Sequence, residues 1–579
     1  GMPIYQPFHI VGFYSAFPAD IISFTDVYAG GFGARYGGRI SSVIDINTRN
    51  GSKEQVRASA SIAPFLSGVQ VEFPVVKGES SLMLSVRESI IDRVSNPLLG
   101  EELPFRFGDR FLKFHANLNQ TSSFSFTGLR SYDEGNISIA DRTRTEASVR
   151  KSTWNNQAYG ARYRFIPDDA AVMFEATFNY SRLDSRYRLT ADELREASVS
   201  GGTGAMTFAY LLGDSDLYFG IFGGINSFDW DLGSSQTAES SGVSSGGGWI
   251  EGRFVLNEYY RFEPSFRVEA FSRGQGRYVD PRGRLIWLPT GAGSRNRVSL
   301  AIGSYRQQIV GINNQQDVSD VFTVWAASPK ATPVPRAIHY IVGWQNRVLP
   351  WLELKTELYY KELDHLSFPA FDETANRLST YASVNGSARG MDASVDVTRR
   401  LFSVAVNYSL ARVDYVRPTQ QARSIFASGL TTNRLLPHVE FSPPHDRRHQ
   451  VNALGQVSFG KNSLSARFVF GSGLPFTQIN GYYDRVQEFD SSGDEHLTDP
   501  GITAVSRSEL YNERLPTYHR MDVSFERRAM IGAHRATFQL GVVNLYDRAN
   551  IFEYNIFTGE RVDQLPLIPS FGMRVDFQR

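Results

Sequence analysis

The sequence contains no cysteine among its 579 residues, so neither disulfide bonds nor cysteine-ligated metal sites can form. It also has no excess of charge, because 60 Lys and Arg residues balance 60 Asp and Glu residues. A balanced chain lacks the basic surface that nucleic-acid binding needs, which argues against a nucleic acid as partner.

Long apolar runs are missing as well. No segment approaches the ~18 consecutive apolar residues of a membrane helix, and the mean hydropathy is −0.28. A transmembrane β-barrel is apolar only at alternate positions, so these two observations do not exclude a membrane protein.

Catalytic motifs are scarce. The chain has no HExxH sequence and no Walker-type phosphate loop. His445 and His449 are four residues apart, but Pro443 and Pro444 precede them and indicate a turn, where helical spacing does not apply. A solvated turn before a strand is the favoured interpretation. We therefore expect no enzyme, no catalytic residue, no metal site and no cofactor.

What the chain has instead is a period of two. Between residues 402 and 412, Phe, Val, Tyr and Leu alternate with Ser, Ala and Asn, and residues 298–304 and 464–470 repeat the pattern. Each such stretch gives a strand one apolar face and one small or polar face. The apolar face must be covered either by a second sheet or by lipid.

Strand length favours lipid. The stretch 402–413 is twelve residues long, against ~5–6 for soluble strands and ~9–11 for a tilted membrane strand. Helical periodicity is scarce, and residues 190–197 are the best candidate for a short loop helix. The alternative, a soluble propeller or β-solenoid, would show a repeat of about 40–50 residues, which is not visible.

The densest glycine cluster lies in residues 27–51, VYAGGFGARYGGRISSVIDINTRNG. Glycine at this density marks backbone with positive φ or in close contact with other backbone. The pattern YxGGFxARYGGRxSSVxDxxTRxG resembles the end of the plug domain of TonB-dependent outer-membrane receptors, in their Bacteroidetes-type form. Residues 1–17, GMPIYQPFHIVGFYSAF, resemble the stretch that precedes it in that family.

Further stretches carry the same resemblance along the chain, namely residues 279–285, 442–449, 515–522, 543–547 and 566–577. The family usually ends on an aromatic residue, whereas Phe577 is here followed by Gln578 and Arg579. The resemblance implies two domains: residues 1–53 as the C-terminal part of a plug and residues 54–579 as a transmembrane β-barrel. It also implies that a signal peptide, a TonB-recruiting segment and the first part of the plug lie upstream of Gly1.

The lengths of the connections fit such a barrel. Short segments such as 76–80 and 459–462 suit periplasmic turns. Long polar segments suit extracellular loops; they are 232–248, 331–338, 419–444 and 482–516. Twenty-two strands, as in plugged transporters, would use roughly 24 residues each, whereas 16 strands would leave about 33. We therefore expect an all-β fold, an antiparallel transmembrane barrel of about 22 strands with plug residues inside.

Two groups of residues are candidate site residues. In the family, the loop near His9 faces the extracellular vestibule, and the hypothesis is that it forms the floor of the substrate site. The alternative is that it only packs the plug against the wall. The residues concerned are Tyr5, Phe8, His9, Phe13 and Tyr14.

Arg35, Arg39 and Arg49 form the second group. Buried cations must be paired or solvated, so we expect contacts between plug and barrel. For Arg35 the candidate partners are Glu72, Glu88, Glu263 and Glu357.

The resemblance implies active import of a scarce solute, of the siderophore, vitamin, glycan or peptide class. The work would come from TonB, and lipid of the outer membrane would surround the barrel. A scaffold barrel that no longer transports is the alternative reading, and a passive porin is a third. A surface lipoprotein of the SusD-like kind is a further partner that the family allows.

Overall fold

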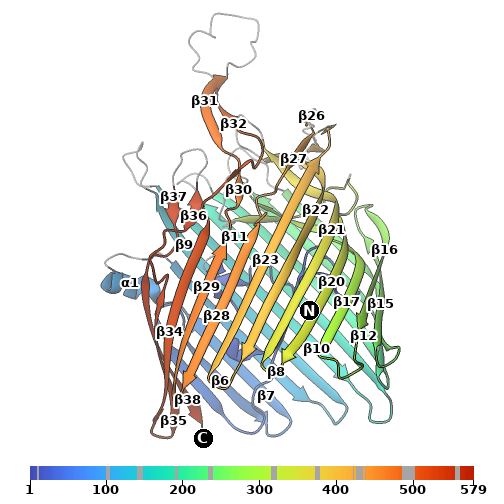
Figure 1. Cartoon of the computed structure of the whole chain (residues 1–579), viewed down its shortest axis with the longest axis vertical. Coiled ribbons are helices and arrows are strands. Elements are labelled where there is room, and N and C mark those ends of the chain that lie inside the picture. The colour runs from blue at the N-terminus through green and yellow to red at the C-terminus, as the bar shows by residue number, and fades with distance from the viewer. Residues whose placement is uncertain are drawn as a thin grey trace, which may run out of the picture.

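The computed structural model describes residues 1–9, 12–99, 103, 105–139, 148–188, 194–232, 239–313, 322–330, 332–371, 378–421, 423–424, 435–436, 438–485, 502–554 and 561–578. Within these ranges, 22 strands form the wall of one closed antiparallel barrel (Figure 1). The last strand pairs with the first and closes the ring, with Phe577 opposite Ala58.

In chain order the wall strands are β5 (Arg57–Ile62), β6 (Ser67–Val76), β7 (Ser80–Glu88), β8 (Phe105–Asn117), β9 (Ser122–Ile139), β10 (Ser148–Phe165), β11 (Val172–Arg188), β12 (Leu194–Leu212), β13 (Ser215–Asp231), β14 (Glu239–Val255), β15 (Tyr260–Phe271), β16 (Gly276–Trp287), β17 (Asn296–Arg306), β20 (Arg336–Leu349), β21 (Leu352–Phe371), β22 (Leu378–Thr398), β23 (Phe402–Arg417), β28 (His449–Phe459), β29 (Asn462–Gly471), β34 (Tyr518–Ile531), β35 (His534–Val543) and β38 (Ile568–Gln578).

The two faces of the wall differ as the period of two predicts. On β15 the side chains of Phe262, Phe266 and Val268 are exposed on the outside. The alternate residues Arg267 and Glu269 are buried on the inside and bond to each other, with Arg267 Nε 2.8 Å from Glu269 Oε2. Lipid is the surrounding that an apolar outer face of this kind requires. The predicted transmembrane barrel is confirmed.

The two rims are unequal. One rim carries short turns, such as the one between β12 and β13, where Gly213 has φ 68°. The other carries long connections, including helix α1 (Ile91–Leu99) and the projecting hairpin of β31 (Ile479–Arg485) and β32 (Ile502–Arg507) (Figure 1). No helix in the described part of the chain is long and apolar enough to cross a membrane.

Smaller strand pairs complete the long-loop rim. They are β24 (Gln420–Gln421) with β26 (Leu435–Leu436), β30 (Pro475–Phe476) with β33 (Glu513–Arg514), and β36 (Ile551–Tyr554) with β37 (Arg561–Asp563), while β25 (Arg423–Ser424) and β27 (Val439–Phe441) extend the wall beside β22 and β23.

The segment before β5 lies inside the barrel. It contains the pair β1 (Phe8–His9) and β2 (Tyr14–Ser15), the short 3-10 helix η2 (Ala19–Ile21), and the pair β3 (Ile22–Tyr28) and β4 (Val43–Thr48). Polar contacts tie it to the wall: Lys113 of β8 donates to the carbonyl oxygen of Thr48 over 2.6 Å. The division into a plug of residues 1–53 and a barrel of residues 54–579 stays a prediction; β5 begins at Arg57.

A hairpin from the long-loop rim also enters the lumen. It consists of β18 (Ile309–Asn313) and β19 (Thr323–Ala327) and belongs to the connection between β17 and β20. Its apolar side chains, Ile312 and Val324 among them, pack against Trp154 of β10, Val199 of β12 and Phe228 of β13. This puts an apolar cluster in a lumen that the alternating pattern predicts to be polar.

Two local predictions were wrong. The proposed loop helix at 190–197 is strand where it is described, since β12 begins at Leu194. The Ser/Gly-rich segment 232–248 was expected to be a loop, but from Glu239 onward it is β14. A Cβ atom on Gly247 would lie 1.9 Å from the carbonyl oxygen of Val268. Glycine there permits close approach of neighbouring strands and does not mark flexibility.

Candidate functional site at the plug–barrel interface

The described parts of the predicted vestibule segment, residues 5–9 and 12–14, lie in the half of the lumen nearer the long loops. Tyr14 stacks at 5.9 Å on Phe107, which stands near the long-loop end of β8, and lies 5.3 Å from Phe65 of the β5–β6 connection. Tyr5 meets Trp325 of β19 edge to face at 5.0 Å. The segment therefore sits below the loops and below the β18–β19 hairpin.

His9 is fully buried between two strands of the wall. Its Nδ1 lies 2.7 Å from Asp133 of β9 and its Nε2 lies 3.3 Å from Asp109 of β8. Arg87 of β7 pairs with the same Asp109 over 2.6 Å. Both ring nitrogens face carboxylates, so the protonated imidazole satisfies both bonds. Two cations then balance two anions, and this group joins the plug to three wall strands.

The pKa of His9 follows from these contacts. Burial by itself lowers the pKa of the imidazole, but the hydrogen bonds and charges of Asp109 and Asp133 outweigh burial and raise the pKa above its ordinary value. We conclude that His9 is a charged contact between plug and wall.

The other four predicted floor residues differ in exposure. Tyr5 and Tyr14 pack in the apolar clusters described above, and burial raises the pKa of both phenols. Phe13 lies under the guanidinium of Arg520, 4.5 Å from the ring centre. Phe8 is 44% exposed. Packing therefore accounts for three of the four, and Phe8 offers free apolar surface to a solute.

The three predicted arginines have three different surroundings. Arg49 donates to Glu72 of β6, with Nη1 3.0 Å from Oε2, and so joins plug and wall. Arg35 lies 3.6 Å from Asp45 of β4, within the plug. Arg39 donates to the carbonyl oxygen of Gly38 and has no ion pair among the described residues; burial lowers its pKa.

The expected partners of Arg35 were Glu72, Glu88, Glu263 and Glu357, and the structure differs from that expectation. Pairing of β3 with β4 sets Asp45 beside the glycine-rich loop, and Tyr36 also donates to Asp45 over 2.8 Å. A carboxylate of the plug itself thus neutralises Arg35, and Glu72 is occupied by Arg49.

The glycine-rich loop is held through its backbone. Arg282 of β16 donates to the carbonyl oxygens of Gly33, Tyr36 and Phe32 over 2.6, 2.8 and 3.3 Å. A Cβ atom on Gly33 would lie 2.0 Å from a carboxylate oxygen of Glu251. The glycines of this motif therefore allow wall side chains to reach the plug backbone.

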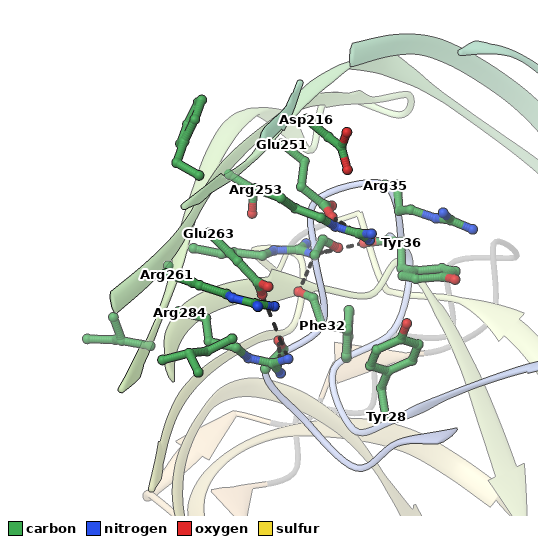
Figure 2. Close-up of a pocket in the computed structure, with 18 of the residues that line it drawn as sticks. Tyr28, Phe32, Arg35, Tyr36, Asp216, Glu251, Arg253, Arg261, Glu263 and Arg284 are labelled. Carbon is green, nitrogen blue, oxygen red and sulfur yellow. Dashed lines mark hydrogen bonds and ion pairs between the residues drawn. The ribbon is translucent and has the colours of Figure 1, made fainter. Parts of the chain in front are cut away.

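A cavity of about 350 Å³ lies between this loop and strands β13 to β17 (Figure 2). Its lining includes Phe32, Tyr36, Glu251, Arg253 and Arg284. Neither its place nor its size was predicted, because it depends on strands that are far apart in the sequence.

The 442–449 motif was interpreted as a solvated turn, and the structure corrects this. It is a turn, but Asp446 is fully buried: Arg448 donates to its carboxylate over 2.8 Å, Arg514 forms an ion pair with it, and the backbone N–H of Val413 donates over 2.8 Å. Burial raises and these donors lower the pKa of Asp446, with a net lowering. The motif anchors the loops above β23 and β28.

One serine has the spacing of a hydrolase nucleophile. Residues 242–246 read GVSSG, which fits GxSxG. In the structure Ser244 lies inside β14, opposite Ile225 of β13. The hydrolase motif requires a sharp turn from a strand into a helix, so Ser244 has no such role.

The sequence matches no protein-family model and no curated protein. Solved structures do match. The outer-membrane ferripyoverdine receptor of Pseudomonas aeruginosa, bound to ferripyoverdine, superposes with a TM-score of 0.66 at 9% identity, over 96% of this chain and 76% of that one. The ferric yersiniabactin uptake receptor FyuA of Yersinia pestis gives 0.66 at 12% identity, over 96% and 85%.

The outer-membrane transporter YddB of Escherichia coli gives a TM-score of 0.65 at 9% identity, over 98% of this chain and 86% of that one. At identities this low, the superpositions establish the fold alone. An outer-membrane location is what this fold supports. The chain has the plug-and-barrel fold of the TonB-dependent outer-membrane receptors, as its glycine-rich motif predicted.

Proposed function

We propose that this protein is an outer-membrane importer that binds a scarce extracellular solute above the plug and releases it into the periplasm when TonB displaces the plug. The fold supports an importer of this kind. The solute belongs to the siderophore, vitamin, glycan or peptide class, and Phe8 and its neighbours form the floor of its site.

One observation supports this proposal above the others. The described residues before β5 lie inside the barrel, and many of the contacts that hold them there are polar. They include the ion pair of Arg49 with Glu72 and the bonds of Lys361 to the carbonyl oxygens of Ala29 and Ser41. Hydrogen bonds exchange for water at a net cost of about 0.5–1.5 kcal/mol each. A pull on the plug can therefore break them one after another.

An engineered disulfide tests whether the plug must move. A Cβ atom on Gly31 would lie 3.2 Å from the Cβ of Ala301 on β17, close to the ~3.5–4.5 Å of a disulfide. Because the chain has no cysteine, the G31C/A301C pair would form the one disulfide. We expect cells with the oxidised protein to lose uptake of a radiolabelled ferric siderophore or of cobalamin, and to regain it after reduction.

The matched control is G51C/M83C, where a Cβ on Gly51 lies 3.3 Å from that of Met83. This bridge forms where the plug joins β5 and leaves the rest of the plug free. Equal uptake before and after reduction of G31C/A301C would contradict plug-dependent import. A correctly assembled barrel that takes up neither solute in either state would support the scaffold alternative.

A further inference from the structure

The cavity under the glycine-rich loop lies on the other side of the plug from the vestibule segment. Many of its wall residues come from the short-turn ends of their strands: Asp214 from the β12–β13 turn, Val255 from the end of β14, Arg261 from the start of β15 and Arg297 from the start of β17. The cavity also reaches up to Tyr305, near the other end of β17. Residues of the loop from Gly31 to Tyr36 line the cavity on its plug side. The cavity thus occupies the place where a solute would emerge below the plug.

The charges around it are unequal. Four carboxylates line the cavity, namely Asp214, Asp216, Glu251 and Glu263, against six guanidinium groups, namely Arg35, Arg253, Arg261, Arg282, Arg284 and Arg297. Asp45 of the plug neutralises Arg35, which leaves five guanidinium groups against four carboxylates and thus a small excess of positive charge.

That excess is concentrated on one side. Arg253 is 3.5 Å from Glu251, and Arg282 donates to plug carbonyl oxygens. Arg284 and Glu263 are separated by 3.9 Å, a loose ion pair. Figure 2 shows Arg261, Glu263 and Arg284 together on one side of the cavity, with Asp216 and Glu251 on the other.

Arg261 and Arg297 complete the basic side. Both are exposed, and within the described part of the chain neither forms an ion pair. Arg284 also donates to the carbonyl oxygen of Gly31 over 2.9 Å, so the donors without a partner among the described residues lie mainly on Arg261 and Arg297. A multivalent oxyanion would satisfy them, because guanidinium groups bind carboxylate and phosphate oxygens in a two-pronged manner.

We propose that this cavity is a release-side binding site for a solute with several carboxylate or phosphate groups, held by Arg261, Arg284 and Arg297. The proposal rests on the import function above and names the chemical class of its solute. The positive charge of these arginines receives the anionic solute as the plug moves and prevents its return to the vestibule.

The test is isothermal titration of the purified, full-length natural protein in neutral detergent at low ionic strength, with citrate and with inorganic phosphate as probes. We expect citrate to bind, and to bind more weakly as salt is raised, because salt screens exposed charges. The R261Q/R297Q variant should bind citrate about tenfold more weakly, since it loses two charge-assisted contacts. If citrate and phosphate bind with equal affinity, the site does not select a solute with several anionic groups, and a small free anion is its ligand.

The matched control is R527Q/R528Q, which removes two arginines near the short-turn end of β34, outside the cavity lining. It should bind citrate as the unmodified protein does. An equal loss of citrate affinity in the control would mean that overall charge, and not this site, binds citrate. Absence of citrate binding in the natural protein would also overturn the site.

A second measurement needs no variant. Phenylglyoxal modifies accessible arginines, and peptide mass spectrometry locates them. Citrate should protect Arg261 and Arg297 but not Arg528; equal protection of all three would overturn the site. Neither experiment requires import. If the protein binds citrate but cells take up none of the labelled solutes, the import function is refuted and the site remains. If cells take up a labelled solute but the protein does not bind citrate, the site is refuted and the import function remains.

Discussion

The plug is held differently on two sides of the barrel. Toward β6 to β9 several contacts join charged side chains to each other, as in His9 with Asp109 and Asp133 and in Arg49 with Glu72, beside a bond from Lys113 to plug backbone. Toward β14 to β21 the wall donates to plug backbone, as Arg282 and Lys361 do. The first side depends on the charge of particular side chains, so pH and salt affect it. The second depends on backbone shape, and hence on glycine.

The largest effect is expected on the backbone side. Arg282→Met leaves the carbonyl oxygen of Tyr36 without this donor, while that of Phe32 keeps Tyr305 and that of Gly33 keeps the backbone N–H of Tyr36. An unsatisfied buried acceptor costs about 1–3 kcal/mol, so plug retention should weaken by about that much. Protease sensitivity of the plug during a urea titration measures this, with the barrel intact.

Arg253→Met is the control for that change, because Arg253 lines the same cavity but makes no hydrogen bond to the plug among the described residues. If both variants released the plug at the same urea concentration, the contrast between the two sides would fail.

His9 should give the next largest effect, as a dependence on pH. Its pKa is raised in the folded protein, so its contribution is complete below its ordinary pKa of about 6.5 and is lost as pH rises through the raised value. Plug retention should therefore weaken on the alkaline side. His9→Gln should remove this dependence.

Conductance of the protein in planar bilayers, recorded across this pH range, reports the released plug as open channels. His438→Gln, at an exposed histidine of the long-loop rim, should leave the pH profile unchanged. A profile that is the same in the His9 variant and in the unmodified protein would remove His9 from plug retention.

Arg49→Gln should have a smaller effect, of about 1 kcal/mol, because Arg49 is partly solvated while Glu72 keeps donors from Gln70 and Ser52. The same urea titration, repeated at low and high salt, should show a smaller salt dependence in this variant, which keeps the ion pairs of His9 and of Arg574 with Asp20. Arg412→Gln, whose partner Asp414 belongs to the same wall strand, should change neither. An unchanged salt dependence in the Arg49 variant would contradict a charge-based contact on this side.

The smallest effect on retention is expected at Phe8. Phe8→Ala removes an exposed side chain and should change plug retention by less than ~0.5 kcal/mol. It should still lower solute affinity on whole cells if Phe8 lies in the floor of the site. Phe13→Ala, by contrast, loses a packed ring and its contact with Arg520, and should weaken retention. Unchanged solute affinity in the Phe8 variant would remove it from the floor.

The outer wall could be predicted from the sequence, and the lumen could not. Every outward residue meets the same surroundings, so one rule covers Phe262, Phe266 and Val268 alike. Each lumen contact is a separate match between distant residues: His9 and Asp133 are 124 positions apart. Alternation says that Asp133 points inward, but not which partner it meets.

Glycine was the ambiguous signal. In the plug motif, dense glycine correctly indicated close backbone contact, as Gly33 beside Glu251 shows. In residues 239–248 the same composition was taken for a loop, although Gly247 serves close contact between strands. A single sequence cannot separate these cases, because the contact partner decides what the missing side chain is for.

The pairing of β5 with β38 sets the order of assembly. The eleven residues of β38 are the last strand of the wall, so the ring stays open until the C-terminal end has been made. Until then β5 and β35 present unpaired backbone groups, which lipid cannot satisfy. The plug is then enclosed at the same moment as the wall is completed. A chain truncated before Ile568 would have neither a closed wall nor an enclosed plug.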